Sequence, residues 1–161
     1  MSNVLIVGVG NESCRALKKL KRLPKECSIL GISADPKSFS WLPSGASHLL
    51  LNKKWHLRKN GWKMVKEKLK GTSYVFILSS CGDGITAPKI AVMAKDRKAK
   101  YFLVTAYPAT SVMNILGLRR DIQSKNLWVA SGAFLEGAVE VIGQILKSGV
   151  LGKETKTRKV K

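Results

Sequence analysis

The sequence YVFILSSCGDGITAPKIAVMA, from Tyr74 to Ala94, predicts a buried strand, a glycine turn and the start of a helix. Its first residues are mostly aromatic and β-branched, which is typical of a strand buried on both faces of a parallel sheet. Thr86 is placed to cap the helix, and Pro88 falls in the first turn, where proline is tolerated. The turn Gly82-Asp83-Gly84 can aim backbone N–H groups at an anion, and a plain strand-to-helix turn explains its glycines equally well.

A second unit of the same kind lies near the N-terminus. The apolar run Val4 to Val7 is followed by Gly8-Val9-Gly10-Asn11, and either Asn11 or Ser13 is expected to cap the next helix. That helix is predicted to end at Pro24. Its apolar face holds Cys14, Leu17, Leu20 and Leu23. Two such units indicate a doubly wound α/β sheet, which binds ligands at the carboxyl ends of its strands. If the two strands are neighbours, both glycine loops open on one crevice.

The remaining segments extend this pattern. Further strands are predicted at Ser28–Ser33, His48–Leu51, Tyr101–Thr105 and Leu127–Ala130. Further helices are predicted within Asn52–Lys70, from about Val112 to Ser124 and from about Ala133 to Lys147. The fold class is therefore α/β, with a single doubly wound, mostly parallel sheet of about six strands and helices on both faces. Residues 1–150 are expected to form this domain, and the basic tail 151–161 is expected to be disordered.

The chain is strongly basic, since 29 Lys and Arg stand against 10 Asp and Glu and give a net charge of +19. This balance favours nucleic acid, an acidic membrane surface or another polyanion as partner, or it reflects the proteome of the organism. The cations gather in the first helix, in Lys53–Lys70 and in the C-terminal tail. In the second of these regions Trp62, Val65 and Leu69 recur at helical spacing, which predicts a buried stripe beneath a cationic face.

Several function classes are disfavoured by the residues present. Three cysteines and two histidines give no metal-ligand spacing and no readable nucleophile–base pair. No apolar run approaches the ~20 residues of a membrane helix. The first residues lack the basic region of a signal peptide, so a reducing, cytoplasmic setting is expected. His48 is interpreted as a capping or surface residue, and Phe39, Trp41 and Leu42 are expected to pack against the sheet.

Asp35 directly follows the second predicted strand and precedes Pro36. An acid at this position often contacts a ribose in nucleotide-binding α/β folds, and an Asp-Pro turn explains it equally well. Gly8-Val9-Gly10 supplies two of the three glycines of the dinucleotide fingerprint GxGxxG, while Ser13 stands at the third position. A Rossmann-type dinucleotide binder is therefore one hypothesis.

Taken in order, these segments resemble the N-terminal nucleotide-binding domain of the FtsZ/tubulin family. Val4 to Asn11 is similar to the family's first strand and glycine-rich loop, and Ile32 to Pro36 resembles its Asn-Thr-Asp segment. Leu69 to Ile77 resembles the family's Leu-Glu-Gly-Ala-Asp-Met-Val-Phe-Ile. Ser80 to Pro88 falls at its Gly-Gly-Gly-Thr-Gly-Thr-Gly signature, and Thr105 to Pro108 resembles the turn after its fifth strand. The resemblance covers the chain from about residue 3 to residue 146.

This resemblance implies a guanine-nucleotide pocket built by both glycine loops. GTP or GDP is the implied cofactor, with Mg²⁺ only beside a triphosphate. The implied contacts are Gly8, Val9, Gly10, Asn11, Asp35, Cys81, Gly82, Asp83, Gly84, Thr86 and Pro108. No catalytic or metal-binding residue is assigned.

The sequence departs from the family's motifs in ways that bear on activity. The segment Cys81 to Ile85 replaces most of the signature, and Asp83 puts a carboxylate where phosphates would sit. The family's base-reading acid falls at about Gly132, and nothing corresponds to the second-domain loop that supplies its catalytic acid. The expectation is therefore a regulatory or cytoskeletal nucleotide-binding domain with weak or absent GTPase activity.

A third hypothesis is a basic, non-enzymatic adaptor. It would bind nucleic acid or an acidic protein through Lys53–Lys70 and the C-terminal tail. Self-association is compatible with all three hypotheses.

Overall fold

The computed structural model describes residues 3–52, 54, 56–79, 86–106, 126–130, 135–149 and 151. The strands are β1 (Val4–Val9), β2 (Cys27–Ser33), β3 (Ser47–Leu50), β4 (Tyr74–Ser79), β5 (Lys100–Ala106) and β6 (Leu127–Ala130). The α-helices are α1 (Asn11–Ala16), α2 (Lys59–Leu69), α3 (Thr86–Asp96) and α5 (Leu135–Ser148). Two 3₁₀ helices complete the described elements, η1 (Leu17–Lys19) and η2 (Pro36–Trp41). The helix predicted near residues 112–124 and the tail from residue 152 lie outside the described residues.

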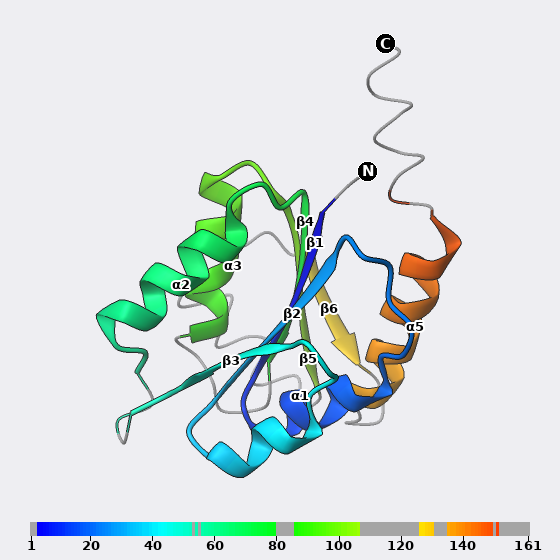
Figure 1. Ribbon diagram of the computed structural model, residues 1–161. Helices are drawn as coiled ribbons and strands as arrows, with labels where there is room; N and C mark the ends of the chain where they lie inside the picture. The colour runs from blue at the N-terminus through cyan, green and yellow to red at the C-terminus, as the bar shows by residue number, and fades with distance from the viewer. Residues whose placement is uncertain are drawn as a thin grey trace.

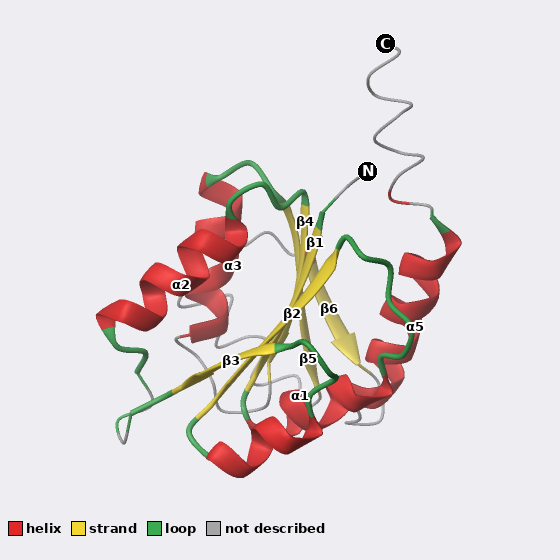
Figure 2. Ribbon diagram, in the orientation of Figure 1, coloured by secondary structure: helices red, strands yellow, loops and turns green. Residues whose placement is uncertain are grey.

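The six strands form one parallel sheet in the order β3-β2-β1-β4-β5-β6. Figure 1 shows α2 and α3 on one face of this sheet and α1 and α5 on the other. Figure 2 separates the two helical layers from the strands by colour. The predicted fold class is thereby confirmed, because a parallel sheet with helices on both faces is the doubly wound architecture.

Two apolar layers hold the helices to the sheet, because successive strand residues point to opposite faces. In β1, Leu5 and Val7 join the cluster under α2 and α3, whereas Ile6 joins the cluster under α1 and α5. In β4, Ile77 belongs to the cluster under α2 and α3, and Phe76 belongs to the cluster under α1 and α5. All of these side chains are essentially inaccessible to solvent, as predicted for strands buried on both faces.

Helix α2 has the amphipathic character that its sequence predicts. Val65 and Leu69 are buried in the core beneath it, and Trp62 is half-buried against the same cluster. Gly71 adopts φ 75° directly after the helix cap, which is the usual way for a glycine to end a helix.

The helix after β1 is shorter than predicted. Its last 3₁₀ turn ends at Lys19, and Leu20 is extended with φ −77° and ψ 118°, so the prediction of a helix reaching Pro24 is wrong. Leu20 is still buried, because the extended chain runs along the same apolar cluster. The predicted caps are also wrong: Gly10 occupies the N-cap position, and both alternatives lie inside the helix.

The segment after β2 differs from the prediction at one aromatic residue. Trp41 is 41% exposed rather than packed on the sheet, with the guanidinium of Arg15 5.3 Å and the ammonium of Lys18 5.0 Å from its ring centroid. Leu42 packs against the α1–α5 cluster, as predicted. Phe39 stacks on exposed His48 with ring centroids 4.6 Å apart, which agrees with the interpretation of His48 as a surface residue.

Candidate functional site

Strands β1 and β4 lie side by side at the point where the strand order reverses. They are parallel and in register, and Val9 at the end of β1 pairs with Ser79 at the end of β4. From β1 the chain continues to β2 on one side, and from β4 to β5 on the other. The loops that follow these two strands therefore leave from the same edge of the sheet, which is where doubly wound sheets bind ligands.

The loop after β1 is a single residue, Gly10, and its backbone conformation is one that in practice only glycine adopts. Gly10 has φ 98° and ψ 167°, a region that side chains exclude. Its N–H donates to the carbonyl oxygen of Ile32 at 2.8 Å, and its own carbonyl accepts from the N–H of Cys14 at 3.1 Å. Helix α1 thus begins one residue beyond the strand. Because the first N–H groups of a helix have no acceptor within it, the first turn brings donors to this edge.

Gly8 has a packing role that the sequence does not reveal. It lies within β1, between Gly31 and Leu78 of the neighbouring strands. A Cβ at this position would lie 2.7 Å from Cδ1 of Leu17 and 3.3 Å from the carbonyl carbon of Ser13. The absence of a side chain therefore lets α1 approach the sheet closely. Val9 is fully buried in the α2–α3 cluster, so its side chain serves the core.

A chain of polar contacts ties the start of α1 to the end of β2. The Ser38 hydroxyl donates to Oδ1 of Asn11, and it lies 3.0 Å from the hydroxyl of Ser33. The Asp35 N–H donates to the same Ser33 oxygen at 3.2 Å. Both serines are at most 2% exposed. Asn11, predicted as a nucleotide contact, thus uses its side-chain oxygen to hold η2 against α1.

Asp35 caps η2, as the Asp-Pro turn hypothesis predicts. Its Oδ1 accepts from the N–H of Lys37 at 3.0 Å, and Pro36 occupies the first turn of η2. The residue is exposed and follows β2 by two positions, and β2 runs parallel to β1, so it belongs to the same carboxyl edge as Gly10. A contact between this carboxylate and a ribose stays a prediction.

The loop after β3 is organised by a residue that the sequence did not single out. Oδ1 of Asn52 accepts from the N–H groups of Lys54 and His56 at 2.9 and 3.0 Å. The Asn52 N–H also donates to the carbonyl oxygen of His56 at 3.0 Å. An Asx turn of this kind was open to prediction, since asparagine commonly bonds to the backbone two residues ahead.

The second glycine loop is the part of the predicted site that the structure does not describe. Cys81, Gly82, Asp83, Gly84 and Pro108 all lie outside the described residues. Thr86 is the first residue of α3 and is buried.

Among the described residues, no group of three or more His, Cys, Asp or Glu side chains could hold a metal ion. The helices that the structure describes are also all too short or too polar to cross a membrane.

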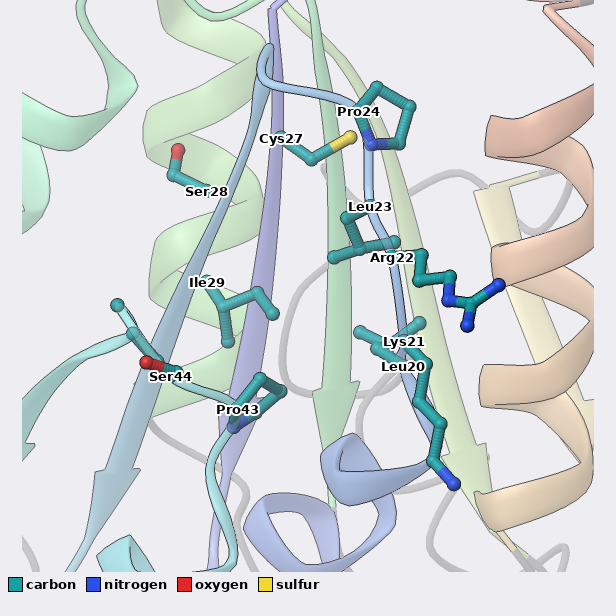
Figure 3. A pocket seen from close by; sticks show the side chains of 12 residues that line it. Leu20, Lys21, Arg22, Leu23, Pro24, Cys27, Ser28, Ile29, Pro43 and Ser44 are labelled. Carbon is teal, nitrogen blue, oxygen red and sulfur yellow. The ribbon is translucent and has the colours of Figure 1, made fainter.

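A separate pocket of about 550 Å³ lies at the amino ends of β2 and β3. It is lined by Leu20–Pro24, Cys27–Ile29 and Pro43–Ala46. Figure 3 shows Leu23 and Ile29 extending toward one another across it, whereas the Arg22 side chain extends away from Ile29. Its lining is therefore mixed, with apolar side chains facing one another and Lys21, Arg22, Ser28 and Ser44 beside them. The pocket lies at the other end of the strands from the Gly10 loop.

Alkylation of Cys27, in the wall of this pocket, should be slow near neutral pH. Burial, with a smaller contribution from the charge of Glu26, raises the pKa of the Cys27 thiol to about 11. Since the thiolate is the reactive form, the rate should rise about tenfold per pH unit until it levels off near that pKa. Peptide-resolved mass spectrometry with iodoacetamide measures this rate, and the urea-unfolded chain is the control. A rate at neutral pH equal to that of the unfolded chain would contradict the burial of this thiol.

This architecture has counterparts among solved protein structures. Neither the protein-family models nor the sequences of curated proteins give a match to this chain. Among solved structures, an empty FtsZ dimer from M. jannaschii has a TM-score of 0.59 at 18% identity, covering 93% of this chain and 53% of that one. TubZ from Clostridium botulinum phage c-st has a TM-score of 0.56 at 18% identity, covering 80% and 51%. A TubZ protofilament from bacteriophage PhiKZ has a TM-score of 0.56 at 12% identity, covering 94% and 57%.

These likenesses, at such low identity, concern the fold. The chain spans about half the length of the FtsZ and TubZ chains that it matches. The chain has the fold of the N-terminal GTPase domain of the FtsZ/tubulin family.

Proposed function

We propose that this chain binds GTP or GDP at the carboxyl edge of the sheet, between the loops that follow β1 and β4. The observation that carries the proposal is the register of these strands: Val9 pairs with Ser79, so both loops leave from one edge. A polyphosphate needs backbone N–H donors and little side-chain bulk at its approach. Gly10 provides an approach without a side chain, and because its own N–H is bonded to the Ile32 carbonyl oxygen, the donors would come from the first turn of α1, which also carries Glu12.

The remaining contacts are assigned by chemistry. Asn11 is fixed by Ser38, so the start of α1 is held in one orientation before a ligand arrives. The exposed carboxylate of Asp35 would accept hydrogen bonds from a ribose while retaining its bond to the N–H of Lys37. The segment Cys81–Gly84 follows β4 in the sequence, and its two glycines are the reason for proposing it as a phosphate contact. Its Asp83 would repel the phosphates unless Mg²⁺ accompanies a triphosphate.

The proposed role is regulatory or cytoskeletal binding, without efficient hydrolysis. This part of the proposal is supported by the segment Cys81–Ile85, which replaces most of the family's signature and puts the Asp83 carboxylate where phosphates would sit. Self-association is part of the proposal, because one similar structure is a TubZ protofilament. Sedimentation with and without nucleotide would reveal it.

Thermal unfolding in the presence of a nucleotide panel tests the proposal. A ligand at about 100 times its Kd stabilises a protein by about 2.7 kcal/mol. For a domain of this size that free energy corresponds to a rise in Tm of about 5–10 °C. GDP and GTP with Mg²⁺ should give this rise, and ATP and NAD should give less. Calorimetric titration provides the Kd for choosing the concentrations.

The same panel separates the competing hypotheses. A larger rise with NAD than with GDP would favour the Rossmann-type dinucleotide binder, whose fingerprint the sequence matches at two glycines of three. No rise and no heat with any nucleotide at millimolar concentration would contradict a nucleotide site of either kind.

A further inference from the structure

The outer surface of α2 carries a stripe of exposed lysines. Lys59, Lys63 and Lys66 follow the spacing i, i+4, i+7, which places them on one side of the helix, and Lys70 at the helix cap continues the row. The apolar residues of α2 lie on another side, in the core. At 1.5 Å per residue the row is about 16 Å long.

Helix α3 extends the same cationic face. It packs beside α2, and the ammonium of Lys89 lies 4.1 Å from the ring centroid of Trp62, which joins the two helices at their surface. Arg97 and Lys98 are exposed where α3 gives way to β5. The acids on these two helices are Glu67 and Asp96, both exposed.

The opposite face of the sheet is less one-sided in charge. Helix α5 carries Glu136 and Glu140 against Lys147, and α1 with η1 carries Glu12 against Arg15, Lys18 and Lys19. Among the described residues the positive charge is therefore distributed unevenly, with its most uniform part on α2 and α3. A basic proteome alone predicts no preference between the two faces.

We propose that the α2–α3 face binds double-stranded nucleic acid through its phosphate backbone. One strand of a duplex carries one charge per about 3.4 Å of the axis, so a row of about 16 Å lies opposite about five phosphate charges of that strand. Each phosphate neutralised by a lysine releases condensed counterions, which is the main source of sequence-independent affinity.

The side chains of this face favour a duplex over the other polyanions. Trp62 is half-buried under Lys89 and offers no open ring for stacking an unpaired base. Insertion into an acidic membrane needs an apolar helix face at the surface. The apolar residues Val65 and Leu69 of α2 are buried in the core. Among the described side chains of this helix, Met64 is the large apolar residue at the surface, where it is 36% exposed.

The test compares two variants of equal net charge. One carries Lys59→Gln, Lys63→Gln and Lys66→Gln on α2. The other carries Lys19→Gln, Lys21→Gln and Lys25→Gln, three exposed positions beside α1. Fluorescence anisotropy with duplex DNA and duplex RNA of about 24 base pairs, between about 50 and 200 mM salt, gives the affinity and its salt dependence.

The α2 variant should bind at least about tenfold more weakly than the unmodified chain, and its log–log salt slope should be smaller in magnitude by about 3. The variant beside α1 should keep its slope within about 1. Equal losses in the two variants would overturn the proposal, since net charge alone would then explain binding. No binding of either duplex at about 50 mM salt, or tighter binding to vesicles containing phosphatidylserine, would overturn it as well. Circular dichroism confirms that both variants are folded, and GDP should not compete with the duplex.

Discussion

Replacing Phe76 by alanine should lower the free energy of unfolding by about 3–5 kcal/mol. Phe76 lies at the middle of β4, is 1% exposed and stacks on Phe102 with ring centroids 5.3 Å apart. It belongs to the apolar layer beneath α1 and α5, so truncation removes buried area and leaves a cavity beside the sheet. For a domain of this size the expected fall in Tm is about 10 °C. Urea unfolding followed by circular dichroism measures the loss.

Two further variants make this result specific. Phe76→Leu keeps most of the buried volume and should lose clearly less stability than the alanine variant. Val141→Ala removes an apolar side chain that is 50% exposed on α5, and it should change stability by no more than about 0.5 kcal/mol. A loss below about 1 kcal/mol for Phe76→Ala would mean that β4 is not the central, doubly covered strand.

The sequence predicted the strands because their signal is local. The β6 strand has the predicted bounds, Leu127–Ala130, and β4 begins at the predicted Tyr74. Continuous apolar runs bounded by glycine and polar residues leave little choice of register, since each run is as long as one strand. The doubly wound order followed from the repeat of strand, glycine and helix, because parallel strands need crossover helices on both faces.

The elements that differ from prediction depend on distant contacts. Leu20 continues the helical spacing of its segment, yet the chain leaves the helix one residue earlier and buries this side chain in an extended conformation. Trp41 and Leu42 are adjacent in sequence and both suited to the core, and only the packing of η2 against α1 selects the leucine. A 3.6-residue period carries no information about which of two apolar neighbours turns inward at the end of a 3₁₀ helix.

The candidate site also has features that the sequence predicts and features that depend on distant contacts. The glycine loops and the acid after β2 stand out in the sequence as local signals, and β1 and β4 are neighbours as the hypothesis required. The packing role of Gly8 was hidden, because it depends on Leu17 of the next helical segment. Ser38 was also missed, since burial of a serine in a polar loop follows from its contact with Asn11 and from no pattern within the loop itself.

Gly10→Ala should weaken nucleotide binding at the proposed site by at least about tenfold and destabilise the fold by about 1–3 kcal/mol. At φ 98° and ψ 167° a Cβ is strained, so the alanine backbone has to rotate. That rotation breaks the 2.8 Å hydrogen bond from its N–H to the Ile32 carbonyl and turns the first N–H groups of α1 away from the sheet edge. Calorimetric titration with GDP, together with urea unfolding, measures both effects.

Gly137→Ala is the matched control, because an added Cβ there meets no atom within 4 Å on the exposed side of α5. Within a helix this change should raise stability by up to about 1 kcal/mol and leave nucleotide affinity unchanged. The two losses in Gly10→Ala can then be separated. If the variant is destabilised yet binds GDP as tightly as the unmodified chain, the conformation of Gly10 serves only the turn from β1 into α1, and the phosphates cannot be held by the first turn of that helix. If affinity falls at a temperature where the variant is fully folded, the altered geometry of the N–H donors accounts for the loss. These donors follow β1, whose register with β4 brings the two loops to one edge of the sheet.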